Sequence, residues 1–378
     1  MRPLKASSVR ARALFLSPEP PLAASGGGGL RSASLLEYLR RRYSVDVIDF
    51  ALKPHSRSFA AKAWRNSMRL LRAVPPLFDR YSGYEAQLSA RLGDAEYALG
   101  VVEHFWCAKY APLLRARCRT LVLDLHNIES DLAQTHALAA RWPASWASGR
   151  FAEAYRLLER EWLPRFDIVL VASEDDARRV GHLVEHPRVM VYPNALPEIP
   201  APSVPEENCI VFSGNLEYHP NVEAVRWFRS NVWPRIRERS QGLEWRLIGK
   251  NPDAVARWTS GDGRIRVVGP VQDAVAEIAR AKVAVVPLLS GSGTRFKILE
   301  AWAAERAVVS TPIGAAGLEA RDAEHLLIAE GASALADAVL RLLDDAPLRA
   351  KLGQAGRALY LDRFTWQAAW ERLAEAGI

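Results

Sequence analysis

A short glycine-rich run between an apolar segment and a helical pattern holds the residues best suited to chemistry. Gly291, Ser292, Gly293 and Thr294 follow the apolar stretch 283–289 and open a helical pattern that continues to residue 304. Glycines allow close backbone approach, and a threonine cap leaves the first helix amides free to point at an anion. The run therefore predicts a phosphate-binding loop at the start of a helix.

The helix that follows carries opposite charges on one face. At helical spacing Gly293, Lys297 and Glu300 share a stripe, and the apolar side chains fall on another. A cation at the mouth suits a diphosphate, and a carboxylate one turn deeper suits a pair of ribose hydroxyls. Arg295 adds a second cation beside Lys297. The alternative interpretation is a glycine turn before a surface helix with an ordinary Lys–Glu pair.

Other polar loops follow predicted strands in the first half of the chain. Gly26, Gly27, Gly28 and Gly29 form a predicted loop between strand 13–16 and a helix, but they lack the G-x-G-x-x-G spacing of a dinucleotide site. Such a loop could approach a phosphate or a sugar, or it could simply be flexible.

Two polar residues follow the predicted strand 120–125. His126 and Asn127 stand at its end, where a histidine could contact a substrate hydroxyl or a developing charge. A structural histidine is the alternative. In the second half, Gly214 and Asn215 hold the equivalent place after the strand 209–212, and they are candidates for binding the same ligand as the glycine run.

Strand and helix patterns alternate in two series, which predicts an α/β protein of two doubly wound, Rossmann-like domains. The proline-rich stretch 193–205 separates them. We expect an N-terminal domain over 1–200, a C-terminal domain over 201–360, and a final helical segment over 361–378 that docks on a domain. Strands are expected at 13–16, 45–50, 97–103, 120–125, 167–173, 189–192, 209–212, 244–248, 264–268, 283–289, 307–310 and 326–329, and helices include 30–41, 220–239, 273–281 and 294–304.

Composition limits the class of protein. No apolar run approaches the ~20 residues of a membrane span, and the N-terminal stretch is too short for a signal-peptide core, so a cytoplasmic location is expected. The three cysteines have no metal-ligand spacing, and no D-x-D triplet occurs. We therefore expect no metal and no cofactor. The near-P-loop at Gly249 lacks its first glycine, which argues against an ATPase.

Positive charge is concentrated in the first half. Residues 1–200 hold 28 Lys and Arg against 21 Asp and Glu, whereas residues 201–378 hold 22 of each. The segment 59–71 interleaves basic and apolar side chains, a pattern that suits an anionic membrane surface or a solvated helix face. Nucleic acid is not expected, because no binding module accompanies the charge.

Several segments together resemble one enzyme family. The stretch 287–318, with supporting matches at 212–221, 124–129, 171–174 and 192–194, resembles the donor-binding signature of retaining glycosyltransferases of family 4, also called group 1. The resemblance implies a GT-B architecture, in which two Rossmann-like domains face a central cleft and the C-terminal helix returns to the N-terminal domain. It also implies a nucleotide-sugar substrate, UDP- or GDP-linked, bound by the second domain.

The resemblance assigns roles to individual residues. Glu300 resembles the second glutamate of the E-x7-E motif, near the donor ribose, and Ser292 stands at the first glutamate position. Arg295 and Lys297 would replace the usual diphosphate clamp, His126 resembles the histidine beside the donor sugar, and the Gly26–Gly29 run resembles the flexible first loop.

The sequence therefore predicts a retaining, metal-independent transfer of a sugar to a glycan or lipid-linked saccharide, in cell-surface or exopolysaccharide synthesis. A peripheral position on the inner membrane face is part of this hypothesis. A nucleotide-sugar 2-epimerase and a catalytically silent sugar-nucleotide-binding partner of another transferase are the alternatives.

Overall fold

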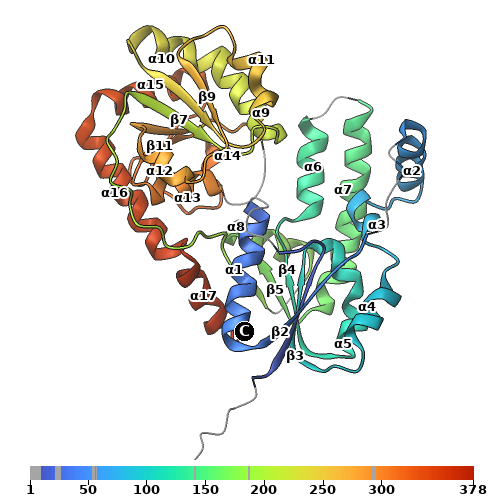
Figure 1. Ribbon diagram of the computed structural model, residues 1–378. Helices are drawn as coiled ribbons and strands as arrows, with labels where there is room; N and C mark the ends of the chain where they lie inside the picture. The colour runs from blue at the N-terminus through green and yellow to red at the C-terminus, as the bar shows by residue number, and fades with distance from the viewer. Residues whose placement is uncertain are drawn as a thin grey trace, which may run out of the picture. The chain divides into compact units, whose positions relative to one another are not determined.

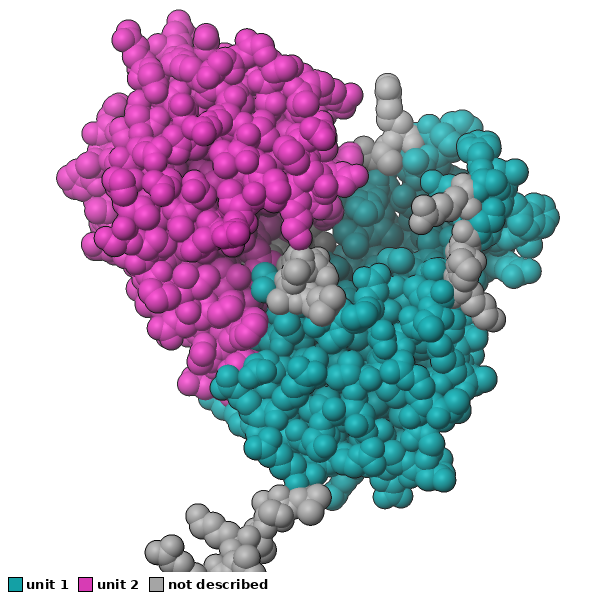
Figure 2. All heavy atoms as spheres, in the orientation of Figure 1, with its two compact units in different colours: residues 1–192, 372–378 teal, residues 193–371 magenta. Residues whose placement is uncertain are grey.

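The computed structural model describes residues 10–21, 27–52, 56, 58–139, 142–185, 188–290 and 295–378. The chain divides into two compact units, coloured separately in Figure 2. Unit 1 comprises residues 1–192 and 372–378, and unit 2 comprises residues 193–371. The predicted boundaries at 200 and 361 thus stand eight residues after the end of the first segment, Tyr192, and eleven before the return at Arg372.

Unit 1 is built on a parallel six-stranded sheet of order β2-β1-β3-β4-β5-β6, with helices on both faces (Figure 1). Its strands are β1 Arg12–Ser17, β2 Ser44–Asp49, β3 Tyr97–Glu103, β4 Cys118–Asp124, β5 Ile168–Val171 and β6 Val189–Val191. Its helices are α1 Gly27–Arg42, α2 Phe59–Leu71, α3 Pro76–Arg80, α4 Glu85–Leu92, α5 Ala111–Arg115, α6 Glu129–Ala139, α7 Ala144–Trp162 and α8 Glu174–Leu183, with 3₁₀ turns at Phe105–Tyr110 and Leu163–Arg165.

The strands of unit 1 are almost continuously apolar because both faces of the sheet are covered. In β1, Leu14 and Leu16 join an apolar core with side chains of α3, α4, α5 and α7. Gly100 of β3 is required by close packing, since an added Cβ would lie 2.6 Å from the Sγ atom of Cys118. Cys107, Cys118 and Cys209 are all buried free thiols.

Unit 2 repeats the plan with a second parallel sheet, of order β12-β11-β10-β7-β8-β9. Its strands are β7 Cys209–Ser213, β8 Glu244–Ile248, β9 Ile265–Gly269, β10 Val283–Val286, β11 Ala307–Ser310 and β12 Leu327–Ile328. Its helices are α9 His219–Trp227, α10 Trp233–Arg239, α11 Ala256–Thr259, α12 Ala274–Ala279, α13 Phe296–Ala303, α14 Pro312–Ala315, α15 Ala332–Asp344 and α16 Ala346–Arg363, with a π-helical segment at Phe228–Val232 and a 3₁₀ turn at Pro252–Val255. The last helix, α17 Trp366–Glu375, begins in unit 2 and ends in unit 1.

Three sequence predictions need correction. Gly27, Gly28 and Gly29 form the first turn of α1 and not a loop, while Gly26 lies outside the described residues. The predicted strand 283–289 ends at Val286, because Pro287 has no N–H to donate to the ladder. The predicted helix 294–304 is observed over Phe296–Ala303, with Arg295 as the extended residue before it, and Thr294 lies outside the described residues.

The proline-rich stretch after Tyr192 is irregular, but it is held firmly within unit 2. Leu196 pairs with Thr365, and the hydroxyl of Tyr360 donates to the Pro197 carbonyl at 2.7 Å. Arg357 donates to the Ile199 carbonyl at 3.1 Å. The prolines therefore mark a packed connection and not a loose tether.

The chain ends in unit 1 after α17. The terminal carbonyl oxygen of Ile378 accepts from the hydroxyl of Tyr38 at 2.7 Å and from Nη1 of Arg42 at 2.9 Å. Arg188 donates to the carbonyl of Ala376 at 2.6 Å. Among the helices of the described residues, none is both long enough and apolar enough to cross a membrane.

Candidate functional site

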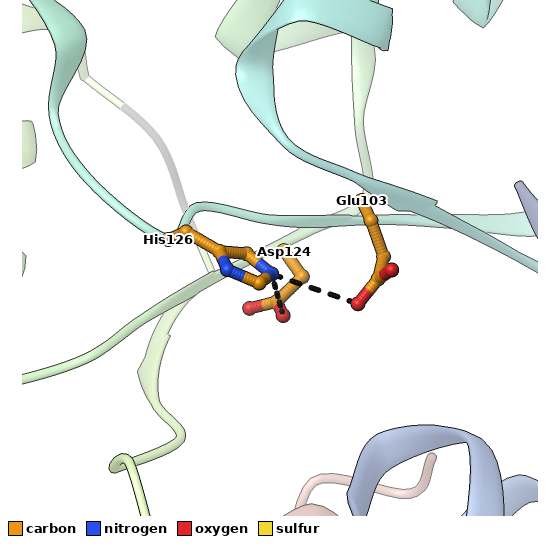
Figure 3. A group of neighbouring side chains, drawn as sticks. All are labelled: Glu103, Asp124 and His126. Carbon is orange, nitrogen blue, oxygen red and sulfur yellow. Dashed lines mark ion pairs between the residues drawn. The ribbon is translucent and has the colours of Figure 1, made fainter. Parts of the chain in front are cut away.

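The ends of β3 and β4 bring three ionisable side chains together in unit 1 (Figure 3). Glu103 and Asp124 are the last residues of the two strands and are partners in the parallel register. His126, two residues later, places its Nε2 atom 3.5 Å from Oε1 of Glu103 and 3.4 Å from Oδ2 of Asp124. Both carboxylates are fully buried, so the imidazole is held between two buried acids.

A buried arginine from α1 completes this group. The Nε atom of Arg31 donates to both carboxylate oxygens of Asp124, at 3.0 and 2.9 Å. The hydroxyl of Ser17 donates to Oε2 of Glu103 at 2.8 Å. We call Arg31, Glu103, Asp124 and His126 the ion cluster. Because it pairs two acids with a guanidinium and an imidazole, it is close to neutral when His126 is protonated.

The charges of the cluster set its protonation. Burial acts to raise the pKa of Asp124, but Arg31 and His126 outweigh it, and the pKa lies well below its usual range. Burial acts to lower the pKa of His126, yet the bonds and charges of Asp124 and Glu103 raise it above the ordinary value. The neighbouring carboxylates therefore favour the protonated form of His126.

A second histidine lies flat against His126. The His104 ring stacks on the His126 ring at 3.7 Å between centroids and on the Trp106 ring at 4.3 Å. Burial, then the charge of His126, lowers the pKa of His104 well below its usual value. Its backbone has φ 61°, a left-handed conformation that costs energy for a residue with a Cβ. The stack fixes the plane of the His126 ring.

The first turn of α1 covers the other edge of the same imidazole. A Cβ added to Gly28 would lie 3.5 Å from Nδ1 of His126, which is ordinary van der Waals contact. Gly28 therefore lies close to His126, and it does so from a helical turn. Asn127 follows His126 in the turn before α6 and is partly buried.

Glu103, Asp124 and His126 could also offer three ligand atoms to a metal ion, all within 4.8 Å of one another. Two observations weigh against that use. Arg31 already brings a positive charge against Asp124. A protonated His126 has no lone pair to give on Nε2. The residues fit a balanced ion cluster better than a cation site.

In unit 2, α13 presents its predicted charged face beside the end of β7. The Nζ atom of Lys297 donates to Oδ1 of Asn221 at 2.9 Å and lies 5.3 Å from the centre of the Phe212 ring. Oε2 of Glu300 accepts from the hydroxyl of Ser213 at 3.0 Å. The apolar stripe faces the core, where Leu299 and Ala303 are fully buried. Lys297 and Glu300 themselves are only partly buried.

The pKa of each charged group shifts toward its neutral form. Burial, helped by the neighbouring charge of Arg295, lowers the pKa of Lys297 to about 8. Burial raises the pKa of Glu300, while Ser213 and Lys297 oppose the rise. At both residues the cost of desolvation thus outweighs the attraction between the two charges. A charged group in this condition is stabilised when a ligand of opposite charge binds beside it.

Two glycines shape the loop beside Lys297. Gly214 has φ 143° and Gly249 has φ 149°. A Cβ on Gly249 would lie 1.7 Å from the carbonyl oxygen of Gly214, and one on Gly214 would lie 2.9 Å from Nδ2 of Asn221. Gly249, which resembled part of a P-loop, serves this close crossing of the β7 and β8 ends.

The buried amide of Asn221 ties that loop to α13. Its Nδ2 atom donates to the carbonyl of Asn215 at 2.7 Å, while its Oδ1 atom accepts from Lys297. The Asn215 side chain accepts from Nδ2 of Asn251 at 3.0 Å. The structure thus brings together four of the residues that were predicted to bind the donor: Gly214, Asn215, Lys297 and Glu300.

Arg295 lies at the N-terminus of α13 and is buried, with Nη2 donating to the carbonyl of Ile313 at 3.3 Å. Ser292, Gly293 and Thr294, predicted as donor-binding residues, lie outside the described residues. The structure therefore describes Arg295, Lys297 and Glu300 of the predicted site, but not its glycine run.

Sequence reasoning gave no role to several residues of the two groups. In unit 1 these are Arg31, Glu103, Asp124 and His104, and in unit 2 they are Ser213, Asn221 and Asn251. The signal was partly present, since Glu103, Asp124 and Ser213 each end a buried strand. Arg31 carried no such signal, because one arginine in a helix resembles any other.

Comparison with known proteins identifies the second half of the chain most directly. Residues 207–345 match the family model "Glycosyl transferases group 1". This segment includes β7, α9 and α13, and therefore Asn221, Lys297 and Glu300. A search of curated protein sequences finds no match.

Solved structures match nearly the whole chain. Sucrose-phosphate synthase from Thermosynechococcus elongatus has a TM-score of 0.73 at 18% identity, covering 97% of this chain and 98% of that one. Anabaena Alr3699/HepE in complex with UDP and glucose has a TM-score of 0.68 at 14% identity, covering 97% and 99%. A structure from E. coli, titled trehalose-6-phosphate bound with UDP-2-fluoro glucose, has a TM-score of 0.67 at 14% identity, covering 97% and 98%.

These likenesses confirm the predicted fold, with two parallel six-stranded sheets in an α/β chain of GT-B architecture. The segment 207–345 is thus similar to the group 1 glycosyl transferases, and the solved structures extend the likeness in fold over nearly the whole chain.

Proposed function

We propose that this protein transfers a sugar from a nucleotide-sugar, UDP- or GDP-linked, to a glycan or lipid-linked saccharide acceptor. The observation that carries the proposal is the charged face of α13 inside the family-matched segment. Lys297 and Glu300 have neutral hydrogen-bond partners, Asn221 and Ser213, and their pKa values are shifted toward the neutral forms. A bound diphosphate would restore favourable charge to Lys297.

In this proposal Lys297 and Arg295 neutralise the departing nucleoside diphosphate, and Glu300 binds the ribose hydroxyls. Gly214 and Asn215 offer backbone groups beside them. The bond from the anomeric carbon to the diphosphate breaks, and the acceptor oxygen loses its proton and bonds to that carbon on the same face, so the configuration is retained. No metal is required. Relatives with bound UDP support a nucleotide donor.

The residues of unit 1 are assigned to the sugar and the acceptor. His126 is proposed to face the donor sugar, and Asn127 with the glycine run, Gly26 to Gly29, to face the acceptor. The positive excess of residues 1–200 favours an acceptor on an anionic membrane surface. Work on the inner membrane face in cell-surface or exopolysaccharide synthesis would follow.

Calorimetry tests the donor site. UDP-sugars and GDP-sugars are titrated into the wild type, Glu300→Ala, and the control Glu238→Ala, which removes an exposed carboxylate of α10 in the same unit. We expect one donor class to bind the wild type and the control equally and Glu300→Ala at least about tenfold more weakly, because the proposed hydrogen bonds from the ribose to a carboxylate are lost. Equal affinity for Glu300→Ala, or no binding by any variant, would contradict the assignment.

Product analysis tests the reaction itself. A small panel of donors is incubated with and without a membrane lipid extract, and release of nucleoside diphosphate and sugar products are measured. Transfer that depends on the extract supports the proposal. Conversion of the donor alone into an epimer would identify a 2-epimerase, and donor binding without turnover would identify a silent binding partner.

A further inference from the structure

Exposed apolar side chains of unit 1 gather on a few neighbouring helices. Among the described residues of this unit, each exposed large apolar side chain lies on or next to α2, α3, α6 or α7. These residues are Phe59, Trp64, Leu71, Leu77, Leu138, Trp142, Trp146 and Leu157. Single exposed apolar residues are normal on a protein surface, but a group of this size calls for a partner.

Helix α2 carries its apolar stripe on the side that faces away from the protein. It has no buried residue, and Trp64 and Leu71, seven positions apart, are 68% and 76% exposed. The half-buried side of the helix is mixed: Met68 and Leu70 are apolar. On the same side Arg69 pairs with Asp79 at 2.8 Å and Arg65 donates to the carbonyl of Ser56 at 3.0 Å, whereas Trp64 and Leu71 lie outside this packing. Packing within the fold therefore does not explain the stripe.

A second exposed apolar group lies where α6 gives way to α7. Leu138 is 80% exposed, Trp142 81% and Trp146 55%. The two helices run side by side as a hairpin, and α2 lies against α7 (Figure 1). The two apolar groups therefore belong to one region of unit 1.

Charge on this region is positive. The stretch 59–72 contains four basic residues, Lys62, Arg65, Arg69 and Arg72, and no acidic one. Lys62 and Arg72 are exposed, and the guanidinium of Arg150 lies 6.0 Å from the centre of the Trp146 ring. Exposed tryptophans flanked by cations are typical of helices that lie in the interface of an anionic bilayer.

We propose that α2 and the adjoining end of the α6–α7 hairpin form a docking surface for an anionic lipid bilayer. Phe59, Trp64, Leu71, Leu138 and Trp142 would enter the headgroup region, and Lys62 with Arg72 would contact lipid phosphates. The hairpin begins at Glu129, two residues after Asn127, and the proposed surface lies at its far end, one length of α6 (Glu129–Ala139) away. Docking here deepens the proposed function, because it would bring a lipid-linked acceptor toward the rim of unit 1 that His126 and Asn127 occupy.

Vesicle flotation tests the surface without turnover. Wild type is mixed with vesicles of phosphatidylcholine alone or of phosphatidylcholine with phosphatidylglycerol. We expect binding to the mixed vesicles, weakened by salt, and little binding to the neutral ones. Lys62→Glu with Arg72→Glu should weaken binding about tenfold or more, because each basic residue near the surface contributes ~1 kcal/mol. Trp64→Ser with Trp142→Ser should weaken it similarly through lost apolar insertion.

The matched controls lie on α16 of unit 2, where Lys351 and Leu361 are exposed. Lys351→Glu and Leu361→Ser should leave vesicle binding unchanged. No binding of the wild type to anionic vesicles, or equal binding by the docking-surface variants, would overturn the proposal. Dimers that the Trp64→Ser change abolishes would instead assign the surface to a second copy of the chain. Donor affinity, measured on the same variants, should be unchanged, which separates this proposal from the donor-site assignment and shows that the variants fold.

Discussion

The two units place charged groups at the ends of parallel strands, but they treat the charges differently. In unit 1, Asp124 is bound by Arg31, and His126 lies between Asp124 and Glu103, so opposite charges meet inside the protein. In unit 2, Lys297 and Glu300 take neutral hydrogen-bond partners. In the first group, the charges pair with one another and hold His126 in place. In the proposed function, the charges of the second group act on a ligand.

The contrast also explains the direction of the pKa shifts. The pKa of Asp124 falls despite burial because Arg31 and His126 are next to it, whereas the pKa of Lys297 falls because burial and Arg295 outweigh the attraction of Glu300. A group whose charged form is stabilised by the protein is part of the scaffold. A group whose charged form is destabilised gains most when a ligand supplies the missing charge.

The largest expected effect comes from breaking the ion cluster. Arg31→Met leaves Asp124 buried beside His126 without its main cation, and we expect a loss of about 3–5 kcal/mol in the free energy of unfolding. Urea denaturation measures it. The control Arg115→Met removes a half-exposed pair with Asp167 and should cost less than about 1 kcal/mol. Equal losses in the two variants would show that the cluster is not the structural element described, and Asp124→Asn added to Arg31→Met should recover part of the loss.

A change at Lys297 should act on function instead. Lys297→Ala removes a cation proposed to stabilise the leaving diphosphate, and we expect turnover to fall about 10²–10³-fold. Steady-state release of nucleoside diphosphate checks this. Lys282 offers a matched control, because its Nζ atom also donates to an asparagine Oδ1 atom, that of Asn208, at 2.9 Å. Lys282→Ala should keep full turnover, and a similar loss in both variants would remove Lys297 from the proposed chemistry.

The sequence predicted the fold well because buried parallel strands leave a strong local signal. The predicted strands 244–248, with alternating apolar residues, and 307–310, with the apolar run 307–309, match the observed strands at both ends. The predicted ends of helices and strands were wrong where local backbone sterics decide where an element begins or ends. The run at Gly27 to Gly29 joins α1, because glycine tolerates the first turn of a helix when other contacts favour it. Val286 ends a strand that hydrophobicity alone would extend.

The candidate site was only partly predictable. Lys297 and Glu300 could be found because helical spacing puts them on one face. The partners that fix them, Asn221 and Ser213, come from a different helix and strand, and no periodicity relates them to α13. Arg31 and Asp124 are 93 positions apart. Contacts of that kind depend on the order of the strands in the sheet, which cannot be deduced from a single sequence.

A third prediction sharpens the contrast with two buried carboxyls of unit 1 that lack a cation like Arg31. Burial foremost, and then the charge of Glu159, raises the pKa of Glu129 to about 8. Burial raises the pKa of Glu159 to about 7. Both values lie above the unfolded value, so their contribution to stability is fully present at low pH and is lost as pH rises through about 7 to 8.

Glu159→Gln should therefore stabilise the fold at pH 9 by on the order of 2 kcal/mol and change little at pH 5. The glutamine keeps an acceptor for the Ser130 amide, which lies 3.1 Å from Oε1 of Glu159. Urea denaturation at the two pH values checks this, with the exposed Glu153→Gln as control. A wild type equally stable at pH 5 and pH 9, with no gain in the variant, would show that Glu159 has found a charge partner.

The smallest expected effect tests whether the charge of Lys297 destabilises the folded protein in the absence of a ligand. The pKa of Lys297 is about 8, below its ordinary value of 10.5. Below pH 8 the residue is charged in the folded and unfolded states, and the full cost of burying that charge is present. Between the two values the unfolded chain binds more protons, so the stability of the wild type should rise with pH.

Lys297→Met should therefore be more stable than the wild type at pH 7, by on the order of 1 kcal/mol after allowing for the lost bond to Asn221. The advantage should shrink as the pH approaches 9.5. Thermal unfolding across this range measures it, and Lys282→Met should show no such gain. A variant that is more stable yet unable to bind donor would mark Lys297 as a charge kept for a ligand, which is the property that separates it from Arg31. A variant that is less stable at every pH would instead place Lys297 in the scaffold, and the contrast between the two units would fail at this residue.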